Sequence, residues 1–312
     1  MDKQRKIMVA ILALLALIAV VAVVDISIKI DKKSKSDLKL SFKEFGQGVE
    51  IVRVEGPIEM SSGAKTFGVS HGAEAIIKQL GDIENNSNIK AVVLRINSPG
   101  GTVAATQEIY EKIWKLRKKN IIIVASMGDI AASGGYYVAS ACNYIVANYG
   151  TITGSIGVIT YSPNLKRLFD KIGIEMNVIK SGKYKDILSS HRDLTQAERT
   201  LIQEMIDLSY NKFVKDIALG RNMNREDIIS IADGRVMNGE TALQNKLIDQ
   251  LGTFEDAVLK AKEMAQLDPD APVYEQNISP FKELFESMKN IFLGRFIMNN
   301  ELLYNLDRIE YR

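Results

Sequence analysis

The hydrophobic positions of this chain follow strand-like and helix-like spacings through most of its length. Continuous or alternating apolar runs predict strands at 49–54, 91–96, 121–126, 144–147, 156–160 and 176–179. Apolar positions three or four apart predict helices at 73–80, 103–118, from about Ser133, and at 165–169, 195–219 and 224–231. Repeated strand, helix, strand units of this length predict an α/β fold with right-handed crossovers.

The apolar run at residues 7–24 is longer than the predicted strands and has no polar positions. Residues 7–24 contain no charge and no proline, follow Lys3, Arg5 and Lys6, and end at Asp25. As a helix this run spans ~27 Å, close to the ~30 Å thickness of the hydrocarbon layer. It exceeds the apolar region of a cleavable signal peptide, and no small-x-small cleavage site precedes Asp25. We therefore expect an uncleaved transmembrane signal anchor. The alternative, a buried soluble helix, is disfavoured because the run has no polar face.

These patterns divide the chain into five parts. A short N-terminal segment (1–6) precedes the anchor (7–24), and a charged, serine-rich juxtamembrane linker (25–47) leads to the folded domain (48–267). The C-terminal tail (268–312) has apolar residues at helical spacing over 281–292, which predicts an amphipathic helix. That helix has three possible partners: its own domain, a neighbouring subunit or the membrane surface. Lysines after the anchor weaken the charge asymmetry, but we expect the bulk of the chain on the outer side.

Composition narrows the functional classes. The chain has 312 residues, 46% of them hydrophobic, and a net charge of +2, which gives no reason to expect a nucleic-acid partner. The single cysteine, Cys142, cannot form an intramolecular disulfide. No spacing of histidine, cysteine or carboxylate residues suggests a metal site, so neither metal nor cofactor is predicted.

Two glycine-rich stretches, 97–101 and 131–137, lie one helix apart. Ser133 falls at a predicted strand-to-helix junction, where the flanking glycines would leave its hydroxyl open. The amide of Gly134, with that of Gly100 or Gly101, could hold an oxyanion. The alternative is that Ser133 only caps the helix while the glycines allow tight packing. Taken alone, this local sequence favours the capping interpretation.

A serine nucleophile needs a base. Neither histidine, His71 or His191, has a recognisable triad context. A lysine could serve if desolvation made its amine neutral at physiological pH, and residues 180–187 carry several lysines just after an apolar run. Ser155, in a Gly-Ser-Ile-Gly segment, could orient such an amine or could be an ordinary turn serine.

The order and spacing of these motifs resemble the signal peptide peptidase A family over residues 49–265. The motifs are Asn-Ser-Pro-Gly-Gly at 97–101, Ala-Ser-Gly-Gly-Tyr-Tyr at 132–137, Gly-Ser-Ile-Gly at 154–157, Lys-Ser-Gly-Lys-Tyr-Lys-Asp at 180–186, Ala-Asp-Gly-Arg-Val at 232–236 and Gly-Glu-Thr-Ala at 239–242. The resemblance implies a membrane-anchored serine protease of the Clp/crotonase fold, built of repeated ββα units, with a serine-lysine dyad. Residues 48–267 would then be its catalytic domain.

The resemblance also assigns roles to individual residues. Ser133 matches the nucleophile, and Ser155 matches the hydroxyl that positions the lysine. Lys185 matches the base because it directly precedes Asp186-Ile187, and Lys183 is the second choice. Gly100, Gly101 and Gly134 match the oxyanion hole.

The same resemblance implies remnant signal peptides and other unstructured membrane-associated peptides as substrates. Taken with the predicted anchor and its flanking charges, it points to a single-pass protein of the cell membrane with its catalytic domain on the extracytoplasmic side. It also implies a homo-oligomer, possibly a ring, whose dyad forms within or between subunits. Two alternatives stay open: a crotonase-type enzyme acting on acyl-thioesters, and a non-catalytic membrane scaffold.

Overall fold

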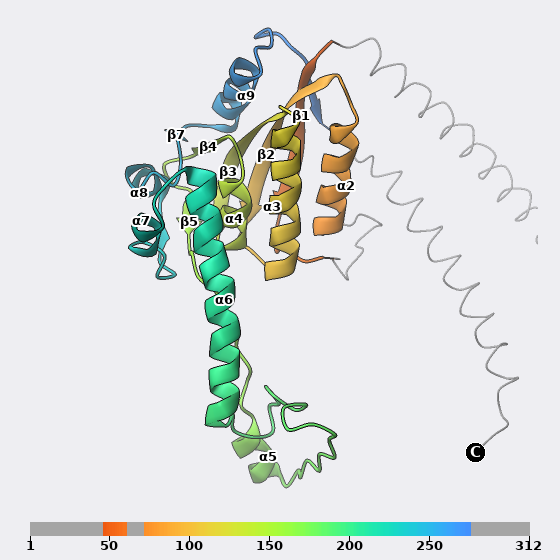
Figure 1. The fold of residues 1–312 in the computed structure, drawn as a ribbon, viewed down its shortest axis with the longest axis vertical. Helices are drawn as coiled ribbons and strands as arrows, with labels where there is room; N and C mark the ends of the chain where they lie inside the picture. The colour runs from red at the N-terminus through yellow and green to blue at the C-terminus, as the bar shows by residue number, and fades with distance from the viewer. Residues whose placement is uncertain (1–45, 61–71, 276–312) are drawn as a thin grey trace, which may run out of the picture. The chain divides into compact units, whose positions relative to one another are not determined.

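The computed structural model describes residues 46–60 and 72–275 (Figure 1). The predicted anchor (7–24), the linker up to residue 45, His71 and the predicted amphipathic helix (281–292) lie outside the described residues. Within the described ranges, no helix is both long enough and apolar enough to cross a membrane.

The centre of the domain is a single, mainly parallel sheet. Its strands are β1 (Gly48–Glu55), β2 (Ile89–Ser98), β3 (Ile122–Ala132), β4 (Tyr144–Ala147), β5 (Ile152–Gly154), β6 (Val236–Met237), β7 (Gln250–Leu251) and β8 (Val273–Glu275). The main path runs β6-β5-β3-β2-β1-β8, and a branch from β3 continues through β4 to β7. Only the β5–β6 pair is antiparallel among these strands.

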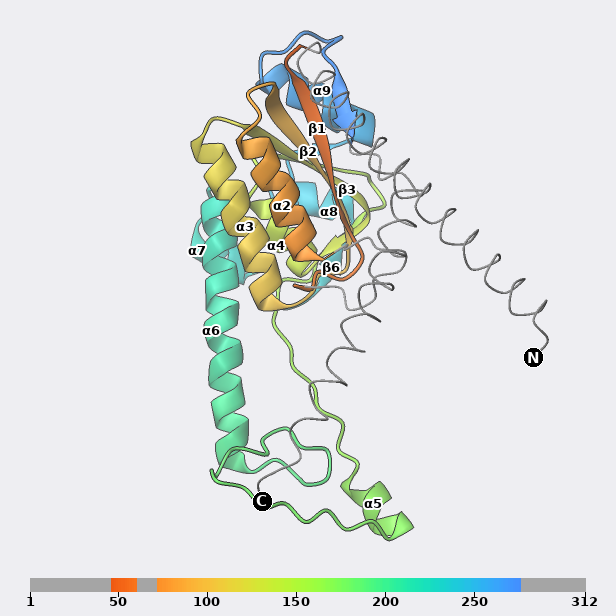
Figure 2. The same cartoon turned by 90° about the vertical axis from the view of Figure 1, so that its right-hand side faces the viewer.

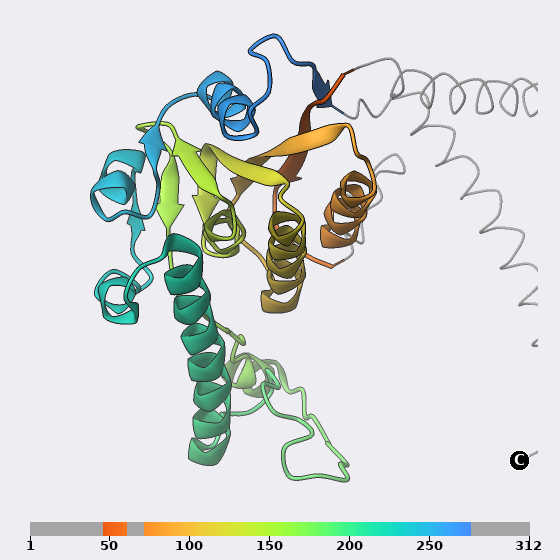
Figure 3. The same cartoon turned by 45° about the horizontal axis from the view of Figure 1, so that its top comes forward.

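Helices cover both faces of this sheet (Figure 3). The described helices are α2 (Ala73–Glu84), α3 (Val103–Lys118), α4 (Gly134–Ser140), α5 (Lys166–Ile172), α6 (Gln196–Arg221), α7 (Arg225–Ile229), α8 (Gly239–Gln244) and α9 (Phe254–Met264), of which α5 lies away from the sheet. In β2, Val92 and Leu94 face a core shared with α2, α3 and α4, whereas Ala91 and Val93 face a core shared with α9. Because both faces are buried, β2 is an almost continuous apolar run rather than an alternating one.

Most predicted elements are confirmed, and the mixed α/β fold is confirmed with them. The helix at 103–118 and the strand at 144–147 have the predicted bounds. The strand predicted at 121–126 continues to Ala132. The sheet also extends into the predicted C-terminal tail (268–312), because β8 pairs with β1.

Two predicted strands, 156–160 and 176–179, are wrong. Neither segment is assigned as a strand or paired with one among the described residues. Ile156 is buried in the core, but beyond it the apolar side chains face outward: Ile159 is 81% exposed and Ile179 is 102% exposed. The second segment and the end of the first belong to an excursion of residues 159–195, here called the arm. The arm includes α5 and lies at the Gln196 end of α6, away from the sheet (Figures 1 and 2).

Helix α6 joins the arm to the sheet domain. A capping box fixes its start, with Thr195 and Glu198 bonding each other's backbone amides. Its C-terminal half packs through Phe213, Val214 and Ile217, whereas Met205 and Leu208 in the N-terminal half are exposed. Near the other end, Gly220 approaches α4 so closely that a Cβ atom would lie 2.0 Å from the Ser140 carbonyl oxygen.

The contact between α6 and α4 predicts that alanine has opposite effects on stability at Gly220 and at Gly81. Gly220→Ala forces α6 away from α4 and should lower the free energy of unfolding by about 1–3 kcal/mol. Gly81→Ala is the matched control, because the nearest atom to its new Cβ would be a lysine Nζ at 3.6 Å. That control should raise the free energy of unfolding by about 0.5–1 kcal/mol. Chemical denaturation of both variants checks this, and equal stability of the two would contradict the packing.

Candidate active site

The turn between β3 and α4 holds Ser133 in a strained conformation. Its φ of 53° and ψ of −121° lie outside the regions that L-residues favour. Such strain costs about 1–3 kcal/mol and persists where the surroundings fix it, often at functional sites. The Ser133 amide donates to the Gly154 carbonyl (2.9 Å), and the Ser133 carbonyl accepts from the Tyr137 amide (2.9 Å). Both backbone groups are therefore engaged. The hydroxyl makes no hydrogen bond to any described residue, so Ser133 is not acting as a side-chain cap.

Two glycines that follow β2 lie against this turn. Gly100 has a φ of 104°, and a Cβ added there would be 2.7 Å from the Gly134 nitrogen and 2.9 Å from the Ser133 Cβ. A Cβ on Gly134 would be 3.1 Å from the Gly101 nitrogen. The structure thus brings Gly100, Gly101, Ser133 and Gly134 together, as the sequence predicted.

The amides of Gly101 and Gly134 are suited to binding an anion. The Ile58 amide donates to the Gly100 carbonyl and the Ile58 carbonyl accepts from the Thr102 amide (both 2.9 Å), so the Gly101 amide between them points away from Ile58. Gly134 is the first residue of α4, where helical amides have no intrahelical acceptor. Neither amide has a hydrogen-bond acceptor within 46–60 or 72–275. Two such donors beside a serine hydroxyl match the requirement for stabilising an oxyanion.

Ser155 lies on the neighbouring strand end. Ala132 of β3 pairs with Gly154 of β5, so the residue that follows each strand is a serine, and the two serines are neighbours. Ser155 also has a positive φ, 50°, and its amide donates to the Arg235 carbonyl (2.8 Å). Two strained serines side by side indicate that the sheet edge is shaped for more than packing.

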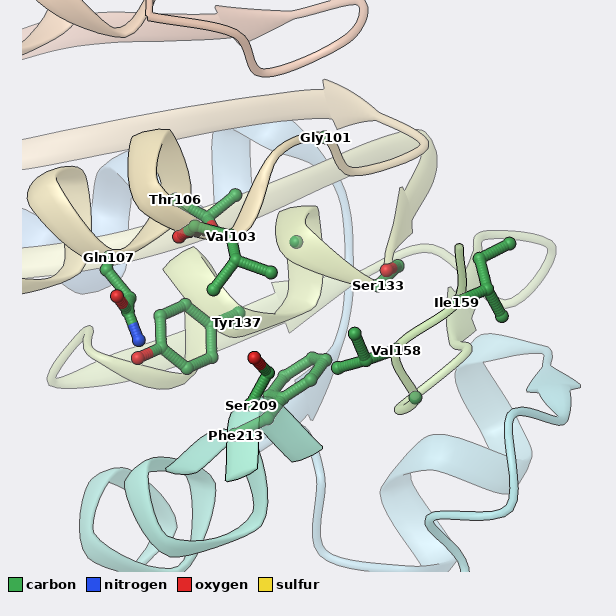
Figure 4. A pocket seen from close by; sticks show the side chains of 12 residues that line it. Gly101, Val103, Thr106, Gln107, Ser133, Tyr137, Val158, Ile159, Ser209 and Phe213 are labelled. Atoms are coloured by element: carbon green, nitrogen blue, oxygen red, sulfur yellow. Dashed lines mark hydrogen bonds between the residues drawn. The ribbon is translucent and has the colours of Figure 1, made fainter. Parts of the chain in front are cut away.

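A pocket opens beside Ser133 (Figure 4). Its walls come from α3, α4, α6 and the segment after β5: Gly101, Val103, Thr106, Gln107, Ser133, Gly134, Tyr137, Gly157, Val158, Ile159, Ser209 and Phe213. The Tyr137 hydroxyl donates to the buried Asp216 carboxylate, which also accepts from Lys212. Burial first, and then this bond, raise the pKa of Tyr137, so its phenol stays neutral. None of the residues that line the pocket is a carboxylate, and most of the lining surface is apolar.

Lys185 is not part of this pocket. It lies in the arm, where its neighbour Asp186 is joined through Arg192 to Glu198 at the start of α6. Ser209, which lines the pocket, is eleven residues further along α6, so about 16 Å of helix separates the two positions. Within one chain, the structure does not bring Lys185 to Ser133.

Among the described residues, Cys142 and His191 offer no alternative centre. Burial raises the pKa of the Cys142 thiol to about 12, so this cysteine is an inert core residue. His191 lies in the arm, outside the pocket. In the described part of the chain, no three histidine, cysteine or carboxylate side chains are grouped closely enough to hold a metal ion.

Comparison with known proteins is consistent with this geometry. Residues 115–268 match Peptidase family S49, and residues 68–146 match the Clp protease family. A protein of Synechocystis sp. named as a protease is 47% identical over 221 residues, which cover 71% of this chain and 76% of that protein. The chain belongs to peptidase family S49.

Further relatives in this family carry more specific names. A protein of Enterococcus faecium named as signal peptide peptidase SppA is 38% identical over 199 residues, 64% of this chain and 58% of that protein. The chloroplastic serine protease SPPA of Arabidopsis thaliana is 37% identical over 221 residues, 70% of this chain and 32% of that protein. The resemblance to signal peptide peptidase A is thereby confirmed, and S49 membership indicates a serine peptidase.

Several residues of this S49 site were not predicted from the sequence. Ile58 holds the Gly100 turn through its backbone, and Thr106 packs on Gly134, where a Cβ would lie 2.5 Å from the threonine methyl. Phe213 and Ser209 come from α6, far along the chain. Backbone bracing leaves no trace in residue types, and the role of Phe213 resembles ordinary helix packing.

The close approach of the two turns predicts a sensitive position. Gly100→Ala places a Cβ against Ser133 and the Gly134 nitrogen at a φ that alanine rarely adopts, so the turns must separate. A shift of about 1 Å should reduce peptide hydrolysis about 100-fold or more. Gly150→Ala is the control, since nothing lies within 4 Å of its added Cβ. Kinetic assay of both variants checks this, and an active Gly100→Ala variant would contradict the site.

Proposed function

We propose that the protein is a serine endopeptidase that works through an acyl-enzyme on Ser133. The observation that carries this proposal is the strained Ser133 turn facing the amides of Gly101 and Gly134. The hydroxyl oxygen attacks a peptide carbonyl carbon while its proton passes to a neutral lysine amine. The two amides stabilise the resulting oxyanion. The C–N bond then breaks, and the lysine returns the proton to the leaving amine. Water, deprotonated by the same lysine, attacks the ester carbonyl, the bond to the Ser133 oxygen breaks, and the lysine returns the proton to that oxygen.

Lys185 is the base in this proposal, and its neighbours in the arm support the choice. Lys180 is engaged, since its Nζ lies 2.5 Å from the Asp186 carboxylate and 3.2 Å from the Lys183 carbonyl. The Lys183 ammonium lies 5.0 Å from the centre of the Tyr184 ring. The Lys185 side chain has no partner among the described residues. It is therefore the lysine best able to enter another site, where Ser155 would orient it.

We further propose that Lys185 serves the Ser133 of a neighbouring copy in a homo-oligomer. The helix length between the two positions in one chain argues against an internal dyad. The arm also exposes many large apolar side chains: Ile159, Tyr161, Leu168, Ile172, Met176, Val178 and Ile179. An apolar surface of this extent is typical of a protein interface. A head-to-tail contact through the arm would close a ring if the rotation between copies allows it.

The substrate and location complete the proposal. The pocket beside Ser133 is lined mainly by apolar groups, which suits the apolar residues of remnant signal peptides and other unstructured membrane-associated peptides. A single anchor at 7–24 would hold the enzyme at the cell membrane, with the catalytic domain on the extracytoplasmic side. No cofactor takes part in this chemistry.

Single substitutions test the dyad. Ser133→Ala and Lys185→Ala should each lower kcat for a short apolar peptide at least about 1,000-fold, because the nucleophile and base act as a unit. Lys183→Ala is the matched control and should retain activity. Peptide hydrolysis by the purified variants is the measurement.

The two alternatives give different results in the same experiment. Peptide cleavage at the wild-type rate by Ser133→Ala would reject the acyl-enzyme. Turnover of acyl-thioesters that survives Ser133→Ala would instead indicate the crotonase-type reaction. No cleavage of any peptide by the wild-type protein would favour a scaffold.

Mixing the two inactive variants tests the subunit arrangement. If the dyad crosses a subunit boundary, co-assembly of Ser133→Ala and Lys185→Ala chains in equal amounts leaves about one quarter of the sites intact. Activity should then return to about one quarter of the wild-type value. A co-expressed mixture, purified through two different tags, provides the sample. A mixture that remains inactive while its assembly is intact would place the dyad within one chain.

A further inference from the structure

A cluster of charged side chains in the arm lies directly beside the predicted base. The Arg192 guanidinium binds the Asp186 carboxylate through two bonds, Nε–Oδ2 at 2.9 Å and Nη2–Oδ1 at 2.8 Å. It binds the Glu198 carboxylate through two more, Nη1–Oε2 at 2.9 Å and Nη2–Oε1 at 2.6 Å. One planar side chain thus joins two carboxylates in paired geometry.

The cluster links the lysine segment to helix α6. Arg192 Nη2 also donates to the Asp186 carbonyl (3.1 Å), so it holds the backbone next to Lys185 as well as the side chain. At the other end, the Glu198 carboxylate accepts from the Thr195 amide (2.9 Å) in the capping box of α6. The backbone beside Lys185 is therefore tied, through Arg192 and Glu198, to the first turn of the 26-residue helix α6.

The arm has little else to hold this position. No residue from 157 to 197 is buried, so no hydrophobic core orders the arm within one chain. The side chains of the cluster are the exception: Asp186 is 11% exposed, Glu198 is 3% exposed and Arg192 is 25% exposed. Desolvated, charge-assisted pairs of this geometry are stronger than surface pairs.

The pKa values agree with a permanently charged cluster. Hydrogen bonds from Arg192 lower the pKa of Glu198 to about 2, and hydrogen bonds from Arg192 and then Lys180 lower the pKa of Asp186. Both carboxylates therefore remain ionised at any pH where a lysine could act as a base. The charged groups around the Lys185 segment are Lys180, Lys183, Asp186, Arg192 and Glu198, and the carboxylates among them do not titrate in that range.

We propose that Arg192, through Asp186 and Glu198, is the positioning residue that holds Lys185 for proton transfer with Ser133. This inference rests on the proposed role of Lys185 as the base. Arg192 does not touch the substrate or the reacting atoms. Its effect is to fix the backbone one residue from the base, because proton transfer requires the two heavy atoms within about 3.2 Å.

Two Arg192 variants in the full-length protein test the inference. Arg192→Met removes both pairs, and we expect kcat to fall about 100-fold, with KM little changed because the pocket residues are untouched. The loss of the guanidinium also removes a positive charge that pairs with Asp186, one residue from Lys185, so the midpoint of the rise of kcat with pH should move upward by about one unit. Arg192→Lys keeps the charge but loses the paired geometry, so it should recover only part of kcat.

Two controls separate positioning from a general structural effect. Lys166→Met removes an exposed ion pair with Asp170 in the same arm and should leave both kcat and the pH profile unchanged. Glu198→Gln keeps the shape of the side chain and removes its charge, so it should lower kcat as Arg192→Met does but move the midpoint downward, because the positive charge of Arg192 is then less compensated. Light scattering and circular dichroism show whether each variant remains assembled and folded.

The outcomes are distinct. An Arg192→Met variant with the wild-type kcat and pH midpoint would overturn the inference. The inference would also be overturned if both Arg192→Met and Glu198→Gln lost kcat but kept the wild-type pH midpoint. A smaller fraction of folded enzyme would then explain the lower kcat. If Arg192→Met fails to assemble, Arg192→Lys and Glu198→Gln decide by the same criteria. Full activity of Lys185→Ala would instead reject the proposed base, whatever the Arg192 variants do.

Discussion

Contact between two backbone turns, with no side chain between them, is the constraint on which the site depends. The turn at Gly100-Gly101 and the turn at Ser133-Gly134 approach so closely that a Cβ on either glycine face would overlap the other turn. Each turn is supported from behind, the first by the backbone of Ile58 and the second by Thr106 and Gly154. The strained Ser133 backbone is therefore held by its surroundings, which is the condition under which such strain persists.

The sheet makes this contact possible. Strands β2, β3 and β5 are parallel neighbours, so their carboxyl ends reach the same edge, and the residues after each strand meet there. The two cores on either side of the sheet leave these strands little freedom to shift, because close-packed interiors resist displacement. A rigid base of this kind can hold two amides and a hydroxyl in fixed relation.

Unlike the sheet domain, the arm has no buried residues of its own. It has exposed apolar side chains and a charged cluster in place of a core, and it lies beyond the sheet domain at the end of α6. Such a surface is stable in water only with a partner or at a cost in exposed apolar area. In the proposed assembly, one copy contributes the rigid half of the site and its neighbour contributes the base. Catalysis would then require assembly, which would keep isolated chains inactive.

The sequence predicted the local elements better than the long-range contacts. The apolar spacing of α3 and the short run of β4 are strong local signals, and the glycine motifs placed Gly100, Gly101, Ser133 and Gly134 in one site. Residues 156–160 and 176–179 were predicted as strands because apolar runs normally find a partner within the chain. Here neither segment pairs with a described strand, and beyond Ile156, which is buried in the core, their apolar side chains are largely exposed in one chain. The separation of Lys185 from Ser133 depends on the length and direction of α6, which no motif encodes.

The most direct test of the central claim is mass spectrometry of the protein after exposure to a serine-reactive peptide. The account predicts a covalent adduct of one peptide acyl group on Ser133, and its absence from Ser155 and from the Ser133→Ala variant. An adduct on another serine, or none on Ser133 under conditions where the protein cleaves peptides, would contradict it.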